Sequence, residues 1–328
     1  MKKICIALLV VLLAVSFVAC GQTDNGGGGE EITPVSFTVG TLKGPTGMGM
    51  VQLLEEGHVI DENMNVDYLL LAAPDELTAK VISGEVQIAT VPANMAAILY
   101  NKTEQGIQAA SINTLGNLFV LTNGADIQKI EDLAGQKIYI SGQGATPEYA
   151  TRYLLDKAGI ADDVEIEFIS EHSELATLLM AGEAQIAVLP EPFVSTVTLK
   201  SEEVTVALNL KEVWEELSPD SMLAMTCLIV NKEFAKANPE AVEKFLKAYE
   251  GSINYVNTNQ DEAAQKMAEL EIIGSAEIAK SAIPNCAIVY LDAHENKDAL
   301  DKYFDVLFEF NPAAVGGSLP DEAFYYQK

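Results

Sequence analysis

The sequence predicts an α/β protein with two Rossmann-like lobes, each built on a mixed, mainly parallel sheet, and two hinge strands joining the lobes. The first observation is a repeated phrase. "GEVQIATVPANM" begins at Gly84 and "GEAQIAVLPEPF" begins at Gly182, an offset of 182 − 84 = 98 residues. The second is that the correspondence continues upstream of each copy. A chain of 328 residues also favours two domains over one.

The gapless part of the repeat predicts a strand–helix–strand unit in each lobe. "VDYLLLAAPDELTAKVISGEVQIATVP" (Val66–Pro92) lies over "VEIEFISEHSELATLLMAGEAQIAVLP" (Val164–Pro190). Each copy opens with an extended, β-rich run and closes with an apolar run of strand length that ends at proline. Units of this kind normally belong to parallel sheets, with the helix as the crossover.

The helix within each copy has its own start and stop signals. Asp75 and Ser173 each precede Glu-Leu, and both residue types favour the N-cap position. Gly84 and Gly182 stand where a left-handed C-cap is expected. We therefore expect the helices to begin at the two polar residues and to stop at the glycines.

A second pair of matching segments lies upstream. "VSFTVGTLKGPTGMGMVQLL" and "GQKIYISGQGATPEYATRYLL" place Gly44 and Thr46 over Gly144 and Thr146, an offset of 144 − 44 = 100 residues. Each segment predicts a strand, a Gly-Thr loop and a helix. The pattern indicates a duplicated α/β half rather than a solenoid of short repeats.

The remaining sequence supplies the connections between the lobes. "LFVLT" predicts the first crossing strand, and "MLAMTCLIV" predicts a matching strand that returns. Long helices follow, and one apolar face is formed by Val242, Phe245, Leu246, Tyr249 and Ile253. We expect this tail to buttress the first lobe.

The N-terminus has the features of an export signal. "MKK" precedes an apolar run from Ile4 to Val18 that is short for a membrane span, and "FVAC" resembles the lipobox of bacterial lipoproteins. Lipidation of Cys20 would anchor the protein to the outer side of the bacterial cell membrane; an ordinary signal peptide cut nearby is the alternative. The expected division is a lipoprotein signal peptide over 1–20, a flexible Gly-rich tether over 21–33, lobe 1 over 34–121 plus 228–328, and lobe 2 over 122–227.

Charge excludes several partners. The chain has 48 acidic and 20 basic residues, and loss of Lys2 and Lys3 with the signal gives 18 − 48 = −30. So acidic a surface repels nucleic acid and anionic headgroups. Arg152 is the single arginine in the sequence, which disfavours a strongly anionic ligand because such ligands are usually held by guanidinium groups.

Two cysteines remain once Cys5 is removed and Cys20 is lipidated. Cys227 lies in "MLAMTCLIV" and Cys286 in "IPNCAIVY". The apolar contexts favour buried thiols, whereas export would also permit a disulfide between them.

The order of several motifs resembles one family. "LKGPTGMG", "GEVQIATVPAN", "DLAGQKIYIS" with "GATP", "GEAQIAVLPEP", "NPEAVEKFLKAY" and "GGSLPDEAFYY" are similar to substrate-binding proteins of bacterial ABC importers, in the nitrate/sulfonate/taurine and thiamine-precursor group. The resemblance implies a type II periplasmic-binding fold and a monomer without cofactor or enzymatic activity. It implies that the lobes close on a small organic ligand (an amine, a heterocycle or a sulfonate-like molecule) and deliver it to a permease with its ATPase.

Ligands of open α/β sheets bind beyond the carboxyl ends of the strands, against loops and helix N-termini. Four loops qualify: "LKGPTG" with its N–H groups, "SGQGATP" with two hydroxyls, and the residues after each repeated strand. The candidate ligand-binding residues are Leu42, Lys43, Gly44, Pro45, Thr46, Gly47, Pro92, Ala93, Asn94, Thr114, Ser141, Gly144, Ala145, Thr146 and Glu191. A plain tight turn and an exposed lysine are the alternatives for the first loop.

The resemblance implies ligand contacts at Asn94 and Glu191. A buried Glu191 would favour a cationic or hydrogen-bond-donating ligand. The alternative is that Glu191 caps the next helix or pairs across the cleft. Phe193 and Tyr149 could stack on a ring, although aromatic residues at such positions often belong to the core.

Other classes of protein fit the sequence less well. His58, His172 and His294 are far apart and lie beside acidic residues, so no metal site is expected. An enzyme of the thiamine-pyrimidine or menaquinone-pathway type would share the fold, but no Gly-x-Ser-x-Gly motif or phosphate loop is present. The ligand-sensing component of a signalling system is a further alternative.

Overall fold

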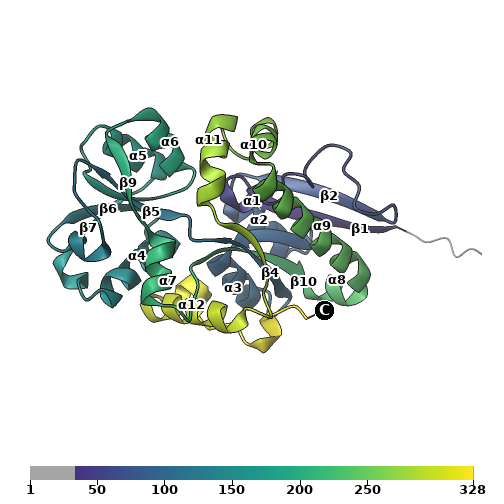
Figure 1. Ribbon diagram of the computed structural model, residues 1–328. Helices are drawn as coiled ribbons and strands as arrows, with labels where there is room; N and C mark the ends of the chain where they lie inside the picture. Colours follow the sequence, from purple (N-terminus) through teal and green to yellow (C-terminus); the bar gives the residue numbers. More distant parts are fainter. Residues whose placement is uncertain (1–33, 328) are drawn as a thin grey trace, which may run out of the picture. The chain divides into compact units, whose positions relative to one another are not determined.

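A computed structural model describes residues 34–327 of the protein, and Figure 1 shows its elements in chain order. The predicted signal peptide over 1–20, with Cys20, and the tether over 21–33 lie outside the described residues. None of the helices described over 34–327 is long and apolar enough to cross a membrane.

Two mixed sheets organise the described chain, each flanked by helices. The first has the order β11-β4-β10-β3-β1-β2 and the second the order β7-β6-β8-β5-β9. The strands of the first sheet are β1 (Val35–Leu42), β2 (Met64–Leu71), β3 (Ile88–Pro92), β4 (Ile107–Leu115), β10 (Ala224–Asn231) and β11 (Ile288–Asp292). Those of the second are β5 (Leu118–Asn123), β6 (Lys137–Ser141), β7 (Glu165–Ile169), β8 (Ile186–Pro190) and β9 (Val204–Asn209).

The α/β class with two mixed sheets is confirmed, but parallel pairing does not dominate. β1 pairs in parallel with β2 and β3, and β6 pairs in parallel with β7 and β8. The other described strand pairs are antiparallel, because β10 and β11 in the first sheet and β5 in the second run opposite to the parallel halves, while β4 and β9 run in the same sense as those halves.

The parallel halves are the duplicated unit that the sequence predicted. The order β2-β1-β3 in one sheet is matched by β7-β6-β8 in the other. The helices in the repeat are α2 (Pro74–Ile82) and α5 (His172–Met180). Gly84 and Gly182 follow them with φ of 76° and 73°, the left-handed conformation expected of a C-cap glycine.

The expected helix starts are wrong by a short distance. α2 is preceded by Ala73 and α5 by Glu171, neither of which caps with its side chain. Asp75 and Ser173 therefore lie inside the first turn. Pro74 explains the earlier start in α2, because its fixed φ suits the first helical position.

The helix expected after "LKGPTG" is also much shorter than the pattern suggested. α1 (Pro45–Met48) is a single turn, and irregular turns continue to Gly57. The glycines permit close packing: a Cβ on Gly47 would lie 2.5 Å from the carbonyl oxygen of Leu42, and one on Gly49 would lie 3.0 Å from the hydroxyl of Tyr249.

The remaining helices cover both faces of the sheets. They are α3 (Ala93–Lys102), α4 (Thr146–Lys157), α6 (Phe193–Lys200), α7 (Leu210–Leu217), α8 (Lys232–Ala237), α9 (Pro239–Thr258), α10 (Gln260–Glu269), α11 (Ala276–Ala282) and α12 (Lys297–Phe310). Short 3₁₀ turns are η1 (Ile130–Leu133), η2 (Ala161–Asp163), η3 (Ile283–Asn285), η4 (Pro312–Val315) and η5 (Glu322–Phe324). The predicted apolar face of α9 is fully buried.

The chain passes between the sheets at two short segments. β4 ends at Leu115 and β5 begins at Leu118, so the first passage is Gly116–Asn117, and the return lies between α7 and β10. The segments touch, since the Gly116 N–H donates to the Leu223 carbonyl over 2.8 Å. Strand pairing thus moves both expected boundaries: all of β5 belongs to the second sheet and all of β10 to the first. The lobes as separate units remain a prediction.

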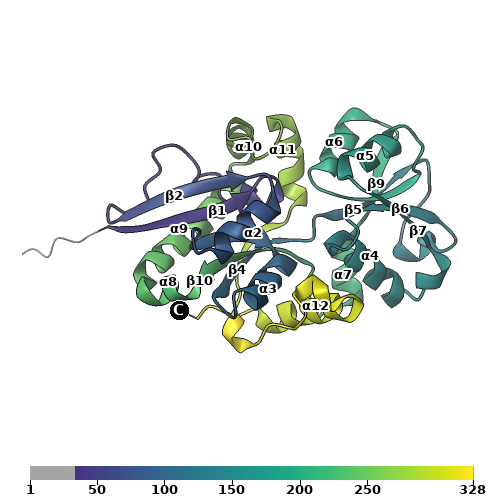
Figure 2. The ribbon, with the colours of Figure 1, turned by 180° about the vertical axis from the view of Figure 1, so that it is seen from behind.

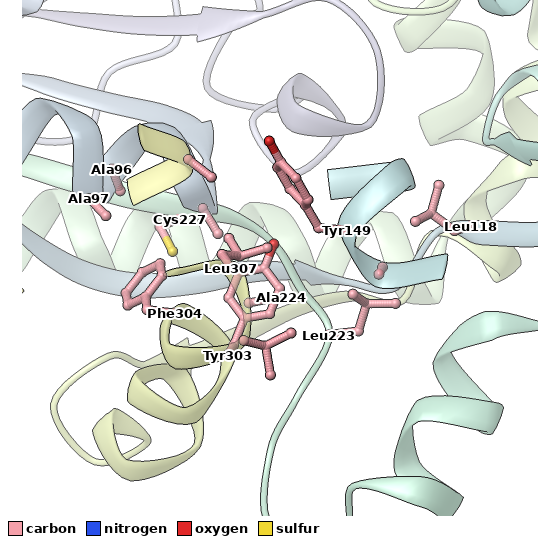
Figure 3. Packing of buried hydrophobic residues seen from close by; sticks show 14 of the residues in the cluster. Ala96, Ala97, Leu118, Tyr149, Leu223, Ala224, Cys227, Tyr303, Phe304 and Leu307 are labelled. Atoms are coloured by element: carbon pink, nitrogen blue, oxygen red, sulfur yellow. The ribbon is translucent and has the colours of Figure 1, made fainter. Parts of the chain in front are cut away.

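The C-terminal tail does more than buttress the first lobe. Tyr303, Phe304 and Leu307 of α12 are fully buried and share a core with Ala96 and Ala97 of α3 (Figure 3). The same core includes residues of α4, and Figure 2 shows α12 running beside both α3 and α7. α12 therefore joins the helical layers of the two sheets by hydrophobic packing.

The two cysteines of the described chain are buried free thiols. Cys227 lies within β10 and Cys286 just before β11, and no disulfide joins them. Burial raises the pKa of the Cys227 thiol to about 12. The interpretation as buried thiols is confirmed, and the disulfide alternative is wrong.

A methyl group at position 116 would disturb the passage between the sheets. A Cβ there would lie 2.5 Å from the Cβ of Lys211 and 3.1 Å from Cδ2 of Leu223. We expect Gly116→Ala to lower the free energy of unfolding by about 1–3 kcal/mol, because neighbouring groups must shift. Gly251→Ala is the control: its site on α9 is open, so alanine should raise that free energy by about 0.5–1 kcal/mol. Denaturant titration measures the free energy of unfolding of both variants. An unchanged value for Gly116→Ala would contradict the close packing around Gly116.

Candidate functional site

A cavity of about 610 Å³ lies between the loops at the carboxyl ends of the parallel strands. Its walls come from both sheets, from α4 and α6, and from the α10–α11 loop. The lining residues are Lys43, Gly44, Pro45, Thr46, Pro92, Asn94, Met95, Asn117, Ala145, Thr146, Pro147, His172, Pro190, Glu191, Pro192, Phe193, Met225, Thr226, Ile272, Ile273 and Gly274.

The structure brings many of the predicted site residues to this wall. Those that line it are Lys43, Gly44, Pro45, Thr46, Pro92, Asn94, Ala145, Thr146 and Glu191. They come from all four of the predicted loops. Their contact with a ligand stays a prediction.

The other predicted residues are not at the wall. Leu42, Gly47 and Ala93 are buried behind it. Thr114 is buried in β4, where its hydroxyl lies 2.7 Å from that of Thr226, a wall residue. Gly144 is exposed, and its N–H donates to the carboxylate of Glu148 over 2.7 Å.

Three of the N–H groups that the sequence suggested for a ligand in the "LKGPTG" loop are already bonded to backbone carbonyls. The Lys43 N–H donates to the Leu71 carbonyl over 2.9 Å, and the Gly44 N–H donates to the Ile272 carbonyl over 2.8 Å. Gly47 closes the turn back to Gly44. These donors hold the loop against its neighbours, so they are not available to a ligand.

Glu191 is the most deeply buried charged residue of the wall. Only 2% of its surface is exposed. Its Oε2 accepts the Ser195 N–H over 3.0 Å, and its Oε1 accepts the Ser195 hydroxyl over 2.9 Å. Oε1 also accepts Nδ2 of Asn285 over 2.8 Å. Glu191 therefore caps α6, pairs with the η3 turn and faces the cavity at once.

Opposing effects act on the pKa of Glu191. Burial raises it above its usual range, because the charged form is desolvated. The three hydrogen bonds lower it, because they favour the ionised form. Burial wins. Among the described residues, no lysine, arginine or histidine forms an ion pair with this carboxylate.

His172 at the start of α5 and Phe193 at the start of α6 form an aromatic part of the wall. Their ring centroids lie 5.3 Å apart. Nδ1 of His172 lies 2.5 Å from the hydroxyl of Ser141, which is fully buried at the end of β6. Burial lowers the pKa of His172. Ser141 therefore orients the imidazole and does not contact the cavity, contrary to the sequence prediction, which also placed His172 on a solvated face.

Cationic side chains are scarce at the wall. Lys43 lines the cavity, and its ammonium group lies 2.9 Å from the carboxylate of Glu271. Arg152 is paired with Glu148 on α4, away from the cavity. Across residues 34–327, no cluster of three or more His, Cys, Asp or Glu residues is placed to hold a metal ion.

Sequence reasoning missed the walls that the later chain supplies. Ile272, Ile273 and Gly274 come from the α10–α11 loop, and Met225 and Thr226 come from β10. Thr226 sits opposite Pro92 in the antiparallel pairing of β10 with β3. The strand prediction for "MLAMTCLIV" was the available signal for β10, whereas nothing in the repeat marked the α10–α11 loop.

Two sheets with a cavity at their facing strand ends define a class of protein. The fold is that of the periplasmic solute-binding proteins of ABC importers. The family model described as NMT1/THI5 like matches residues 48–263, and the chain belongs to this family. No curated protein sequence matches significantly.

Solved structures support this assignment. An ABC transporter from Parabacteroides distasonis is 27% identical, with a TM-score of 0.76, over 90% of this chain and 99% of that one. The periplasmic aliphatic sulphonate binding protein SsuA from Escherichia coli is 14% identical, with a TM-score of 0.70, over 90% and 92%. A putative periplasmic sulfonate-binding protein SsuA from Methylobacillus flagellatus KT is 15% identical, with a TM-score of 0.66, over 88% and 90%.

The Ser195 hydroxyl should matter most when Glu191 is ionised. The raised pKa means that the folded chain holds this proton more tightly than the unfolded chain, so the carboxyl's contribution to stability falls as pH rises through that range. Removing a donor raises the folded pKa further. We expect Ser195→Ala to cost about 1–3 kcal/mol of unfolding free energy, and more at about pH 7 than at about pH 4.

Thr198→Val is the control for this measurement. The Thr198 hydroxyl donates to the Val194 carbonyl on the same helix and does not contact Glu191. Its loss should have a small effect that does not change with pH. Denaturant titrations at both pH values measure the unfolding free energies of the two variants. A loss in Ser195→Ala that does not change with pH would contradict an ionised, hydrogen-bonded Glu191.

Proposed function

We propose that the protein is the extracytoplasmic receptor of an ABC importer, and that it captures a small organic cation or N–H-rich molecule between its two lobes. The observation that carries this proposal is the cavity between the strand ends, with the buried carboxylate of Glu191 in its wall. Closure of the lobes would trap the ligand for delivery to a membrane permease with its ATPase.

The charges at the wall favour a cation over an anion. Three of the roughly four acceptor positions of the Glu191 carboxylate are used by Ser195 and Asn285, which leaves about one for a donor in the cavity. Lys43 is the lysine at the wall, and Glu271 neutralises it. A sulfonate, the ligand class in the names of two structural neighbours, would lack a guanidinium partner here.

The rest of the wall favours an apolar body on the ligand. Met95 and Met225 come from the first lobe, while Phe193 and the ring of His172 come from the second. Methionine and aromatic side chains adapt to flat, polarisable groups. An organic amine or a protonated heterocycle combines such a body with an N–H donor for Glu191.

The location follows from the same proposal. A receptor of this class works outside the cytoplasm, and lipidation of Cys20 would hold it at the membrane with residues 21–33 as tether. We infer a monomer, because each chain supplies both walls of its own cavity. Mass spectrometry of the mature N-terminus tests the anchor.

An enzyme on the same fold is the second candidate, and one contact is relevant to it. Ser141 and His172 are hydrogen-bonded, which is the pairing that nucleophilic catalysis uses. Ser141 is fully buried, however, and does not line the cavity. A substrate could not reach this hydroxyl, so the pair is better suited to hold the imidazole. Incubation with the co-purified ligand should give no product.

Removal of the Glu191 carboxylate should weaken ligand binding. The ligand is first identified by native mass spectrometry of the purified protein, and a thermal-shift screen of organic cations and sulfonates checks its class. We expect Glu191→Ala to lower affinity by at least about tenfold in calorimetry, because a charge-assisted contact in a desolvated site is lost.

Wild-type affinity for a permanent cation should also fall as pH decreases, because Glu191 becomes protonated.

The exposed Glu183 provides the matched control. Glu183→Ala removes the same charge from the same lobe without touching the cavity, so affinity should be unchanged. Equal affinity of Glu191→Ala and the wild type would reject the assignment, as would stabilisation by sulfonates alone.

A further inference from the structure

Asn285 reaches from the first lobe to the carboxylate of the second. It ends the η3 turn after α11, and its Nδ2 donates to Oε1 of Glu191 over 2.8 Å. The two residues are separated by 94 positions in the sequence. α11 packs against α6, which begins just after Glu191, and Figures 1 and 2 both show these helices facing each other. The contact thus links the turn after α11 to the residue just before α6.

We propose that Asn285 is a positioning residue that couples closure of the lobes to the geometry of Glu191. It completes the donor set of the carboxylate only when the lobes are together. The functional meaning of this coupling rests on the receptor function proposed above. The contact itself is independent of any ligand.

The division of donors between the lobes carries the inference. The two bonds from Ser195 belong to the same helix terminus as Glu191 and persist whatever the lobes do. The backbone N–H of Glu191 is held by the carbonyl of Asn117, in the passage between the sheets, over 2.9 Å. Asn285 is the donor that leaves if the lobes separate. Its loss would leave Oε1 with the Ser195 hydroxyl alone and would open one acceptor position of the carboxylate to water.

Asn285 is itself fixed by its own lobe. Its Nδ2 lies 3.3 Å from the Ser281 carbonyl of α11, which orients the amide toward Glu191. Hydrogen bonds to an ionised acceptor are stronger than those to a neutral one. The Asn285 bond therefore favours the ionised form of Glu191 in the closed arrangement, and it opposes the desolvation that raises the pKa of this carboxyl.

The neighbouring charges do not explain the state of Glu191. The titratable or charged groups on the surrounding elements include Cys286, His172, Glu174, Lys43, Glu277, Lys280 and Lys200. Burial raises the Glu191 pKa, and the hydrogen bonds from Ser195 and Asn285 oppose that shift. Burial raises the pKa of the Cys286 thiol, and the nearby negative charge of Glu191 raises that pKa further. A change in the Glu191 titration on removal of Asn285 would therefore report the bond between them.

The test follows the ligand-free full chain. ¹³C labelling of glutamate side chains gives the titration of Glu191 by NMR, with Glu191→Gln to assign its signal. We expect Asn285→Ala to move this titration to higher pH, because a donor that favours the ionised carboxylate is lost. At pH values where Glu191 is ionised, the radius of gyration of Asn285→Ala from small-angle X-ray scattering should exceed that of the wild type, because one contact between the lobes is gone.

Two further variants make the result decisive. Asn285→Asp keeps the shape but places a second carboxylate beside Glu191, so the titration should move further than in Asn285→Ala, and this variant also serves if the alanine variant does not fold. Asn257→Ala removes an amide that bonds the Ile288 carbonyl within the first lobe over 2.9 Å. It should lower stability and leave both readouts unchanged.

Each outcome separates this inference from the proposed function. An unshifted Glu191 titration in both Asn285 variants would overturn the positioning role, and so would an equal shift in Asn257→Ala. The receptor function would stand in either case, because it is judged by the ligand affinity of Glu191→Ala. A shifted titration together with unchanged affinity in Glu191→Ala would keep the Asn285–Glu191 coupling and reject the ligand assignment.

Discussion

Burial of the Glu191 carboxylate is the physical constraint on which the arrangement of the site depends. Removal of a carboxylate from water costs several kcal/mol unless donors or cations replace the water. The described chain provides no cationic partner and relies instead on Ser195 and Asn285. These donors come from the first turn of α6 and from the short η3 turn, which are far apart in the sequence. The charge is therefore stabilised where α6 and the η3 turn come together.

The topology explains why such donors converge there. β8 ends at Pro190 beside the passage between the sheets, so the next residue is held by the Asn117 carbonyl and begins the approach to α6. The N-terminus of a helix favours an acidic group through its free N–H groups and its dipole. The tail of the chain then adds β10, α11 and η3 from the other side. Duplication supplies the two walls, and the tail joins them.

The repeat made much of this fold predictable, because both copies need the same helix stop and the same buried strand. Gly84 and Gly182 have the expected left-handed conformation, and the strands after them pair as expected. The short α1 was not predictable, because its limits depend on how closely Gly47 and Gly49 pack against distant atoms. The roles of His172 and Asn285 depend on contacts across 31 and 94 positions, which local patterns do not reveal.

The same constraint explains how a cavity of this kind would discriminate between ligands. Under the proposed function, the carboxylate would be hydrated in an open cleft, and closure would remove that water whether or not a ligand is present. The bond from Asn285 offsets part of this cost in the ligand-free protein, and an organic cation would offset more by contacting the remaining acceptor position. A neutral molecule of the same shape would fill the apolar wall formed by Met95, Met225 and Phe193 but would leave the charge uncompensated. An anion would add repulsion. Selectivity would thus arise at closure, because the cost of desolvating Glu191 is the same for every ligand and only a donor can offset it.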